Sequence, residues 1–275
     1  MRKMLLLAII CVVVTACKSK HERAIVYYKR GLVKDSLKDY KAAIAELDSA
    51  IIEDTMALGY YQRGMEYLHI KKYERAIDDL KKVTELTPDN AAAYLQKGNA
   101  EKELWHYNDA YSDYSEAIKT DPDFPEAYCK RGLILRLMSR YDDAAADFNR
   151  AIKIDPKYAK AYVGKGDVDE DWEQFVNAIS EYDTALELDP DCGDAYVGIG
   201  VSKMYLGDNI AAYKALTKAI EIMPENGEAY SWRSLIDLYL RQKDSACLDM
   251  KRSMQLGFRP NDFQSAEEVI KDACE

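Results

Sequence analysis

Four carboxylates stand close together in the run Asp167-Val-Asp169-Glu-Asp171. Alternating acidic side chains supply the oxygen ligands that Ca²⁺ takes in proteins. A twelve-residue calcium loop also needs glycine at its sixth position and a bidentate glutamate at its twelfth. Counted from the first aspartate of this run, those positions hold Trp172 and Ala178. The run therefore predicts an acidic patch near the end of a helix and not a calcium site.

The other residues that could do chemistry do not form a catalytic or metal-binding pattern. His21, His69 and His106 lack the spacing of metal ligands, and none has an acidic partner within reach on its own helix. The sequence has no phosphate-binding glycine loop, no Gly-x-Ser-x-Gly and no His-Glu-x-x-His motif. A reaction would need a second domain, for which 1–23 and 259–275 are too short. We therefore expect no enzymatic activity, no metal and no cofactor.

The composition is that of a folded protein that does not bind nucleic acid. The chain of 275 residues is 48% hydrophobic and 31% charged, which excludes a disordered chain and a protein with many membrane spans. Its formal charge of −10 argues against nucleic acid as a partner, because such proteins need a basic face. Tyrosine is in excess, with 21 Tyr against 5 Phe and 3 Trp.

The first sixteen residues, 1–16, have the layout of a secretory signal peptide. Two basic residues precede an unbroken apolar run over 4–14, which is too short to span a bilayer comfortably. Val14-Thr15-Ala16 then stands directly before Cys17, and small residues before a cysteine resemble the lipobox of bacterial lipoproteins. The resemblance implies cleavage before Cys17, diacylglycerol on its thiol and acylation of the new amino group. An ordinary secretory peptide that happens to contain a cysteine is the alternative.

The same resemblance predicts where the protein is found. A lipidated Cys17 and a short linker, 17–23, would precede the folded part, and each buried methylene of the acyl chains contributes about 0.8 kcal/mol to anchoring. No second apolar run reaches membrane length, so we expect a lipid-anchored protein of the bacterial cell envelope. Lys18 follows the cysteine, where an Asp is the inner-membrane retention signal of enteric lipoproteins. Its absence favours the outer membrane, on the face toward the periplasm.

A period of 34 residues organises the rest of the chain. Several residue types recur in one register: Pro88, Pro122, Pro156, Pro190 and Pro224; Gly31, Gly64, Gly98, Gly132, Gly166 and Gly200; Ala43, Ala76, Ala110, Ala144, Ala178, Ala212 and Ala246; Tyr27, Tyr60, Tyr94, Tyr128, Tyr162, Tyr196 and Tyr230. Series locked together in this way are typical of a repeat protein.

The spacing resembles the tetratricopeptide repeat (TPR), a helix, a tight turn and a second helix. Its aromatic, Gly, Ala, aromatic, Ala and Pro positions are all matched by Tyr128, Gly132, Ala144, Phe148, Ala151 and Pro156. The resemblance implies an all-α fold, a right-handed α-solenoid of seven helix pairs over 24–258. The seven repeats are 24–56, 57–90, 91–124, 125–158, 159–192, 193–226 and 227–258. The last has Ser234 in place of the glycine, and terminal repeats are often atypical.

Packing explains the glycine and tyrosine series. A glycine in the first helix of each repeat costs about 1 kcal/mol of helix propensity relative to alanine. We expect it to let the second helix approach where the recurring alanine faces it, and we expect the tyrosines to fill the core.

A base and an acid sixteen residues apart recur in six repeats. The pairs are Arg30 and Glu46, Arg63 and Asp79, Lys97 and Asp113, Arg131 and Asp147, Lys165 and Glu181, and Arg233 and Asp249. The sixth repeat replaces both members, with Ile199 and Ala215. A partly buried cation without its anion is destabilising, so the joint change predicts an ion pair within each repeat. Two independent solvated positions would not explain it.

The C-terminal residues 259–275 are predicted to form a capping helix. Apolar residues recur there with helical spacing at Phe263, Ala266, Val269, Ile270 and Ala273. The helix would cover the open end of the last repeat.

The cysteines beyond the signal peptide and Cys17 are Cys129, Cys192, Cys247 and Cys274, and their spacing excludes zinc pairs. We expect them to be small core residues. If a disulfide forms, Cys247 and Cys274 are the only pair expected to meet.

The TPR resemblance implies a concave groove lined by the first helices, in which TPR proteins bind another protein as an extended peptide or a helix. The projected groove positions are Tyr28, Tyr61, Met65, His69, Leu95, Asn99, Lys102, Arg136, Asp167 and Tyr205. Chaperone-tail binders of this family clamp a carboxylate with Lys and Asn at two positions that are Tyr28 and Leu32 here, so that specificity is not expected. We expect a membrane-anchored scaffold or adaptor with an unidentified protein partner. The alternative is a self-assembling structural solenoid of the cell envelope.

Overall fold

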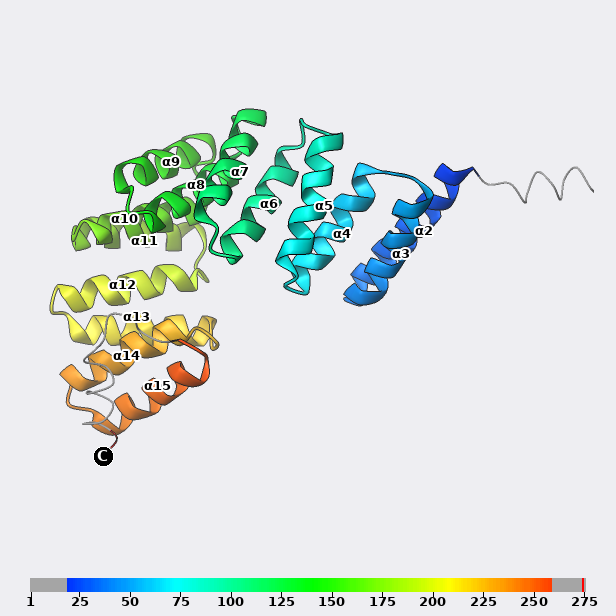
Figure 1. Cartoon of the computed structure of the whole chain (residues 1–275). Helices are drawn as coiled ribbons and strands as arrows, with labels where there is room; N and C mark the ends of the chain where they lie inside the picture. Colours follow the sequence, from blue (N-terminus) through cyan, green and yellow to red (C-terminus); the bar gives the residue numbers. More distant parts are fainter. Residues whose placement is uncertain (1–18, 259–273, 275) are drawn as a thin grey trace, which may run out of the picture. The chain divides into compact units, whose positions relative to one another are not determined.

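The computed structural model describes residues 19–258 and Cys274, and within 19–258 every regular element is an α-helix (Figure 1). The helices follow one another as α2 (Lys20–Ser36), α3 (Tyr40–Glu53), α4 (Ala57–His69), α5 (Tyr73–Leu86), α6 (Ala91–Glu103), α7 (Tyr107–Thr120), α8 (Pro125–Leu137), α9 (Tyr141–Ile154), α10 (Ala159–Asp171), α11 (Phe175–Leu188), α12 (Gly193–Tyr205), α13 (Asn209–Ile222), α14 (Gly227–Tyr239) and α15 (Lys243–Gln255). These seven helix pairs confirm the predicted all-α repeat fold. The predicted signal peptide, Cys17 and the capping helix up to residue 273 lie outside the described residues.

The chain divides into two compact halves, one reaching Ala127 and the other beginning at Tyr128. In the N-terminal half each helix from α2 to α7 packs on the next, and α4 also contacts α6. In the C-terminal half the helices from α9 to α15 pack in the same order, and α12 contacts both α10 and α14. Within each half, therefore, the first helices of neighbouring repeats lie side by side in one layer.

Every helix pair turns at one residue with a left-handed backbone. These residues are Lys38, Lys71, Trp105, Ser139, Glu173, Gly207 and Arg241, all with positive φ. The residue that follows donates its N–H to a carbonyl five residues earlier, as Arg140 does to Leu135 at 2.8 Å. This bond satisfies a carbonyl at the end of the first helix. The same turn geometry thus starts each second helix in the same register.

A large side chain of each second helix packs against the glycine of its own first helix. A Cβ built on Gly132 would lie 3.0 Å from Phe148 Cε1 and 3.3 Å from the Ala144 carbonyl oxygen. Gly31, Gly64, Gly98, Gly166 and Gly200 meet Leu47, Leu80, Tyr114, Tyr182 and Leu216 in the same way. The expected close approach at the glycine is confirmed, and the large side chain is the main neighbour.

Two of these large side chains also fill a gap in the next repeat. A Cβ on Gly164 would lie 2.2 Å from Phe148 Cε1, and a Cβ on Gly198 would lie 2.3 Å from Tyr182 Cζ. Both rings are fully buried. Where the second helix has Leu80 or Leu216 instead, the equivalent residue of the following repeat is Gln96 or Trp232. At these two junctions a large ring is thus matched to an absent side chain, whereas Tyr114 is followed by Lys130 at the equivalent position.

The predicted ion pairs form in five of the six repeats. Arg131 donates Nε and Nη2 to the two carboxylate oxygens of Asp147, both at 2.7 Å. The same two-bond contact joins Arg63 to Asp79 at 2.8 and 2.6 Å and Arg233 to Asp249 at 2.6 and 2.9 Å. Lys97 contacts Asp113, and Lys165 contacts Glu181, each at 2.6 Å.

The first repeat is the exception, and the prediction for Arg30 and Glu46 is wrong. Within the described residues no ion pair joins them, and the Arg30 guanidinium lies over the Tyr27 ring at 5.7 Å. Arg30 is exposed, so water solvates its charge and no anion is required. In the sixth repeat Ile199 packs against the cluster around Tyr182, which explains the loss of both charges there.

One disulfide forms in the C-terminal half, between Cys247 of α15 and Cys274, with Cα atoms 5.4 Å apart. This corrects the expectation that these two cysteines are free core residues. Their Cα atoms are close enough for a bond without backbone movement. Cys129 is buried and Cys192 is partly buried, as expected of core thiols.

Candidate functional site

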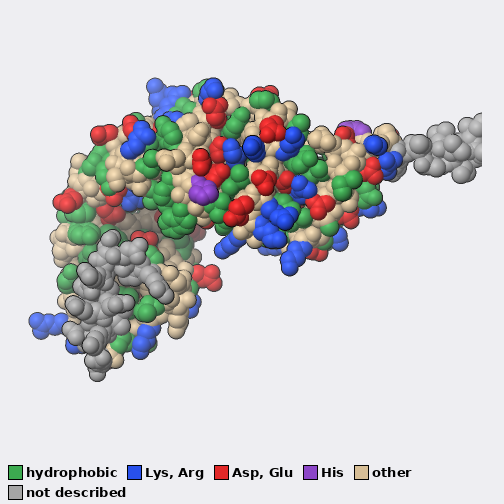
Figure 2. Space-filling model, viewed as in Figure 1, with side chains coloured by type: hydrophobic (Ala, Val, Ile, Leu, Met, Phe, Trp, Pro, Cys, Tyr) green, Lys and Arg blue, Asp and Glu red, His purple; other side chains and the backbone are tan. Residues whose placement is uncertain are grey.

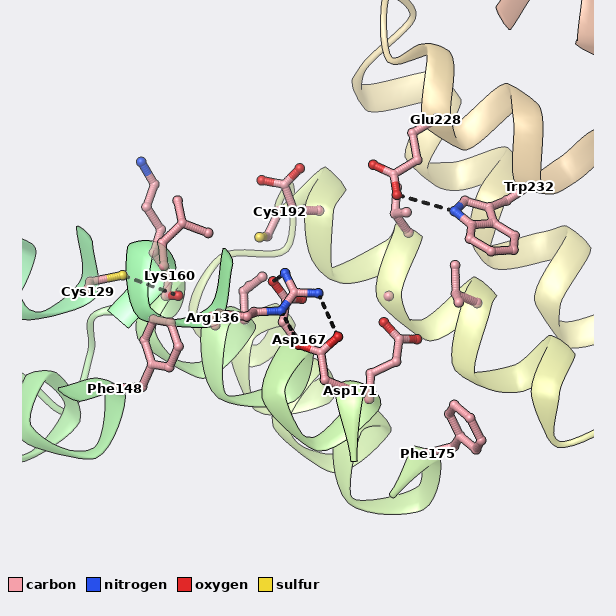
Figure 3. Close-up of a pocket in the computed structure, with 18 of the residues that line it drawn as sticks. Cys129, Arg136, Phe148, Lys160, Asp167, Asp171, Phe175, Cys192, Glu228 and Trp232 are labelled. Atoms are coloured by element: carbon pink, nitrogen blue, oxygen red, sulfur yellow. Dashed lines mark hydrogen bonds and ion pairs between the residues drawn. The ribbon is translucent and has the colours of Figure 1, made fainter. Parts of the chain in front are cut away.

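The first helices of the C-terminal half line a cavity of about 840 Å³ (Figure 3). We call it the C-terminal groove. Most of its lining comes from α8, α10, α12 and α14: Cys129, Lys130, Leu133, Arg136, Lys160, Val163, Gly164, Asp167, Glu170, Asp171, Asp194, Val197, Gly198, Val201, Tyr205, Glu228 and Trp232. Phe148, Glu173, Phe175, Asp189, Cys192 and Asn226 complete it. The groove therefore lies on the layer of first helices, where the family resemblance places it.

Arg136 connects α8 to α10 at the floor of the groove. Its Nε lies 2.6 Å from Asp171 Oδ2, and its Nη1 lies 3.0 Å from Asp167 Oδ2 (Figure 3). Burial alone would lower the pKa of Arg136, but the charges of Asp167 and Asp171 outweigh burial and raise it. The arginine is thus held charged by two acids of the next repeat.

The hydrogen-bond network continues from Asp167 to α11 and α12. The Tyr182 hydroxyl, from the buried ring of α11, faces Asp167 Oδ1 at 2.9 Å and Glu170 Oε2 at 3.4 Å. The Ser202 hydroxyl of α12 donates to Glu170 Oε1 at 3.0 Å. Burial raises the pKa of Asp167, against the charge of Arg136. One polar network thus links three successive repeats beneath the groove.

Glu170 is a group of this network whose pKa is raised far above the usual range of a glutamate. Burial raises its pKa to about 7; the Ser202 hydrogen bond opposes the rise and the Asp167 charge adds to it. The groups facing it are Arg136, Asp167, Tyr182 and Ser202.

The folded protein is expected to gain stability as the pH falls from 8 to 6. Between the ordinary glutamate pKa of 4.5 and about 7, the folded state binds a proton at Glu170 that the unfolded state has released. Stability contributed by this group therefore falls as the pH rises through that window. Glu170→Gln cannot ionise, so the variant should lose this part of the pH dependence. Urea midpoints of both proteins at pH 6 and pH 8 measure the difference, and equal pH dependence would contradict the assignment.

The lining of the C-terminal groove carries an excess of negative charge. Its basic side chains are Lys130, Arg136 and Lys160, against seven acidic ones: Asp167, Glu170, Asp171, Glu173, Asp189, Asp194 and Glu228. On the face seen in Figure 2, by contrast, acidic and basic side chains are interspersed. A ligand in the groove therefore meets more acidic than basic side chains.

Aromatic and apolar side chains accompany these acids at the α12 and α14 side of the groove. Phe175 and Tyr205 stack with ring centroids 4.8 Å apart and planes 7° from parallel. The Trp232 indole N–H donates to Glu228 Oε1 at 3.3 Å (Figure 3). Val197 and Val201 are nearly buried and form the apolar floor of the groove. This combination suits a ligand with both charged and apolar groups.

Of the predicted groove residues, the structure brings Arg136, Asp167 and Tyr205 together in this one cavity. Tyr205 is 57% exposed. The predicted acidic patch is also here, but Asp167 is tied to Arg136 and Tyr182.

The other seven predicted groove residues lie in the N-terminal half. Leu95 is 1% exposed and is a core residue, because α6 packs against α4, α5 and α7. Tyr61 packs against the cluster around Leu80, and His69 stacks on Tyr40 at 4.8 Å. Burial raises the pKa of the partly buried Tyr28, and Met65 is partly buried. Asn99 accepts a hydrogen bond from the Tyr114 hydroxyl at 2.9 Å, and Lys102 pairs with Glu103 at 2.6 Å. Leu95 therefore belongs to the core and is not open to a ligand, in contrast to its predicted place in the groove.

One polar cluster was not predicted from the sequence. His106 Nδ1 lies 2.8 Å from Glu101 Oε2, and Asp109 offers an oxygen within 4.8 Å of both groups. Glu101 lies in the last turn of α6 and His106 directly precedes α7, so a comparison within single helices misses them. The spacing of five residues across a helix–turn boundary is the signal that would have found the pair.

In the part of the chain that the structure describes, no helix combines the length and the apolarity needed to cross a membrane.

Comparison with known proteins gives a consistent family match. Models described as "Tetratricopeptide repeat" match residues 24–51, 57–90, 125–158, 159–192 and 193–226. No curated protein sequence matches the chain significantly.

Solved structures share the fold at low sequence identity. A tetratricopeptide repeat protein from Parabacteroides merdae has a TM-score of 0.77 at 17% identity, over 92% of this chain and 100% of that one. Cut9–Hcn1 of the APC/C has a TM-score of 0.73 at 16% identity, over 94% of this chain and 54% of that one. YrrB, described as a TPR protein with an unusual peptide-binding site, has a TM-score of 0.50 at 24% identity, over 66% of this chain and 95% of that one.

Proposed function

Because this chain belongs to the tetratricopeptide repeat family, we propose that it is a scaffold that binds a segment of a partner protein in the C-terminal groove. The observation that carries this proposal is the cavity of about 840 Å³, with Tyr205 and Trp232 beside an apolar floor. Aromatic residues at a groove contribute much of the binding energy of protein interfaces. YrrB, a protein of the same fold, is described as having a peptide-binding site, which supports a similar use here.

Site-specific cross-linking tests the groove directly. A photo-reactive phenylalanine analogue at Tyr205, which is 57% exposed, should give a discrete covalent adduct with a partner protein in cells. The control carries the same analogue at Ile210 of α13, which is 65% exposed but does not line the groove. Adducts of the same pattern and yield at both positions would contradict a groove-specific partner. An adduct containing only a second copy of this chain would favour the self-assembling alternative.

We also propose that the scaffold is anchored to a bacterial envelope membrane through lipid on Cys17. The sequence Val14-Thr15-Ala16-Cys17 after a short apolar run supports this. An anchored scaffold would hold its partner close to the membrane surface.

Cys17→Ser is expected to move the protein from the membrane fraction to the soluble fraction, because the variant has no thiol to lipidate. Cell fractionation with mass spectrometry of the mature N-terminus measures both the location and the lipid. Cys192→Ser is the control, since it removes a thiol that has no role in anchoring. A Cys17→Ser protein that stays membrane-bound after cleavage of the signal would overturn the anchor.

A further inference from the structure

We infer that the segment bound in the C-terminal groove is basic, with a Lys or Arg side chain placed between the Trp232 indole and the Glu228 and Asp194 carboxylates. This inference rests on the proposed function and names the chemistry of the partner. It follows from the distribution of charge along the groove and from the position of one aromatic ring.

The groove has little positive charge to offer a ligand. Arg136 is already bound at 2.6 Å to Asp171 and at 3.0 Å to Asp167, so these three side chains largely compensate one another. The rest of the lining has two bases against five acids: Glu170, Glu173, Asp189, Asp194 and Glu228. Lys130 and Lys160 come from α8 and α10, and the residues that α12 and α14 contribute to the lining include no base. An acidic segment would therefore meet repulsion along α12 and α14, and a basic segment would meet attraction.

An acid and an aromatic ring lie next to each other on α14. The Trp232 N–H donates to Glu228 Oε1 at 3.3 Å. This bond holds the N–H edge of the indole toward Glu228 of the same helix, α14 (Figure 3). Tryptophan is the best aromatic partner for a cation over its face. A guanidinium or ammonium group beside this ring would contact the indole and the carboxylate together.

The size of the groove and its exposed aromatic surface favour a peptide over a small cation. A cavity of about 840 Å³ holds several residues, and Tyr205, which is 57% exposed, offers apolar surface beside the acids. A chain that alternates basic and apolar side chains would place the former on the acids and the latter on Tyr205. A free metal ion or small amine would leave that aromatic surface uncovered.

A second role of the two acids must be separated by the experiment. Asp194 and Glu228 lie in the first turns of α12 and α14, where acidic residues stabilise helix N-termini. A helix-stabilising role predicts a loss of stability on neutralisation, without a change in peptide binding.

The test uses the purified full-length chain and three fluorescent twelve-residue peptides that share alternating leucines, with arginine, glutamate or serine between them. Fluorescence anisotropy should show tightest binding of the arginine peptide, weakening several-fold between 50 and 300 mM NaCl. Glu228→Gln and Trp232→Leu should each weaken it by roughly tenfold, equivalent to about 1.4 kcal/mol. Thermal melts establish that each variant is folded.

The matched controls lie outside the groove lining. Glu187→Gln removes an exposed acid of α11, and Trp172→Leu removes an exposed tryptophan; both should bind the arginine peptide as the unmodified protein does. Equal binding of all three peptides, or unchanged binding by Glu228→Gln and Trp232→Leu, would overturn the basic-segment inference. A Tyr205 cross-link to a partner, combined with no arginine-peptide binding, would reject this inference while leaving the proposed function intact.

Discussion

Arg131→Ile is expected to lower the stability of the C-terminal half by about 3 kcal/mol, near the lower end of the range for breaking a buried ion pair. The substitution leaves Asp147, whose side chain is 8% exposed, without the two hydrogen bonds from the guanidinium at 2.7 Å. A carboxylate in that setting keeps its desolvation penalty and loses its compensation. Urea unfolding followed by far-UV circular dichroism measures the loss.

The sixth repeat supplies the control for this experiment. Its Ile199 and Ala215 occupy the positions of Arg131 and Asp147, and Ile199 packs in an apolar cluster. Arg131→Ile combined with Asp147→Ala copies that solution and should be more stable than Arg131→Ile alone. A double variant that is as unstable as the sum of both single variants would show that the two side chains are not coupled.

Gly164→Ala is expected to destabilise the C-terminal half by roughly 2 kcal/mol, within the usual range for overpacking. Alanine would improve helix propensity by about 1 kcal/mol, so the net loss measures a larger steric penalty. The new methyl group would lie 2.2 Å from Cε1 of Phe148, a ring that is 1% exposed. Because the ring also packs against Gly132, moving it away from the new methyl group disturbs that contact.

The rescue of this variant uses a residue that other repeats already carry. Leu47, Leu80 and Leu216 stand at the position of Phe148, and the repeats that follow them have a side chain where Gly164 has none. Phe148→Leu should therefore restore most of the stability of Gly164→Ala, although it costs stability in the unmodified protein. Chemical unfolding of all four proteins gives the coupling, and additive losses would contradict the contact.

Most of the fold could be predicted because the same residue types recur at the same positions of successive repeats. The predicted starts of the second to seventh repeats coincide with the starts of α4, α6, α8, α10, α12 and α14. The first repeat differs: α2 begins at Lys20, because Ser19 accepts a bond from the Glu22 N–H while Glu22 accepts one from the Ser19 N–H. That capping box is visible in the sequence, but no other repeat has it in register.

The candidate site was only partly predictable, because its contacts join different repeats. Arg131 and Asp147 belong to one repeat, so the joint change to Ile199 and Ala215 revealed them. Arg136 instead contacts Asp167 and Asp171 in the next repeat, and no second copy of that arrangement exists in the sequence to compare. The distance between neighbouring first helices, which decides such contacts, depends on the whole core between them.

Phe148 fits against Gly164, and Tyr182 fits against Gly198. Because of these contacts, the repeats cannot all be removed or exchanged with the same effect on packing. Removal of the fifth repeat, 159–192, would place Phe148 before Gly198, which also has no side chain. Removal of the sixth, 193–226, would place Tyr182 before Trp232, and two large rings would compete for one space. Deletion of the fifth repeat is therefore expected to cost less packing at the new junction than deletion of the sixth. The order of the repeats thus depends on side chains that pack across the boundary between neighbours. It does not follow from the residues that define each repeat.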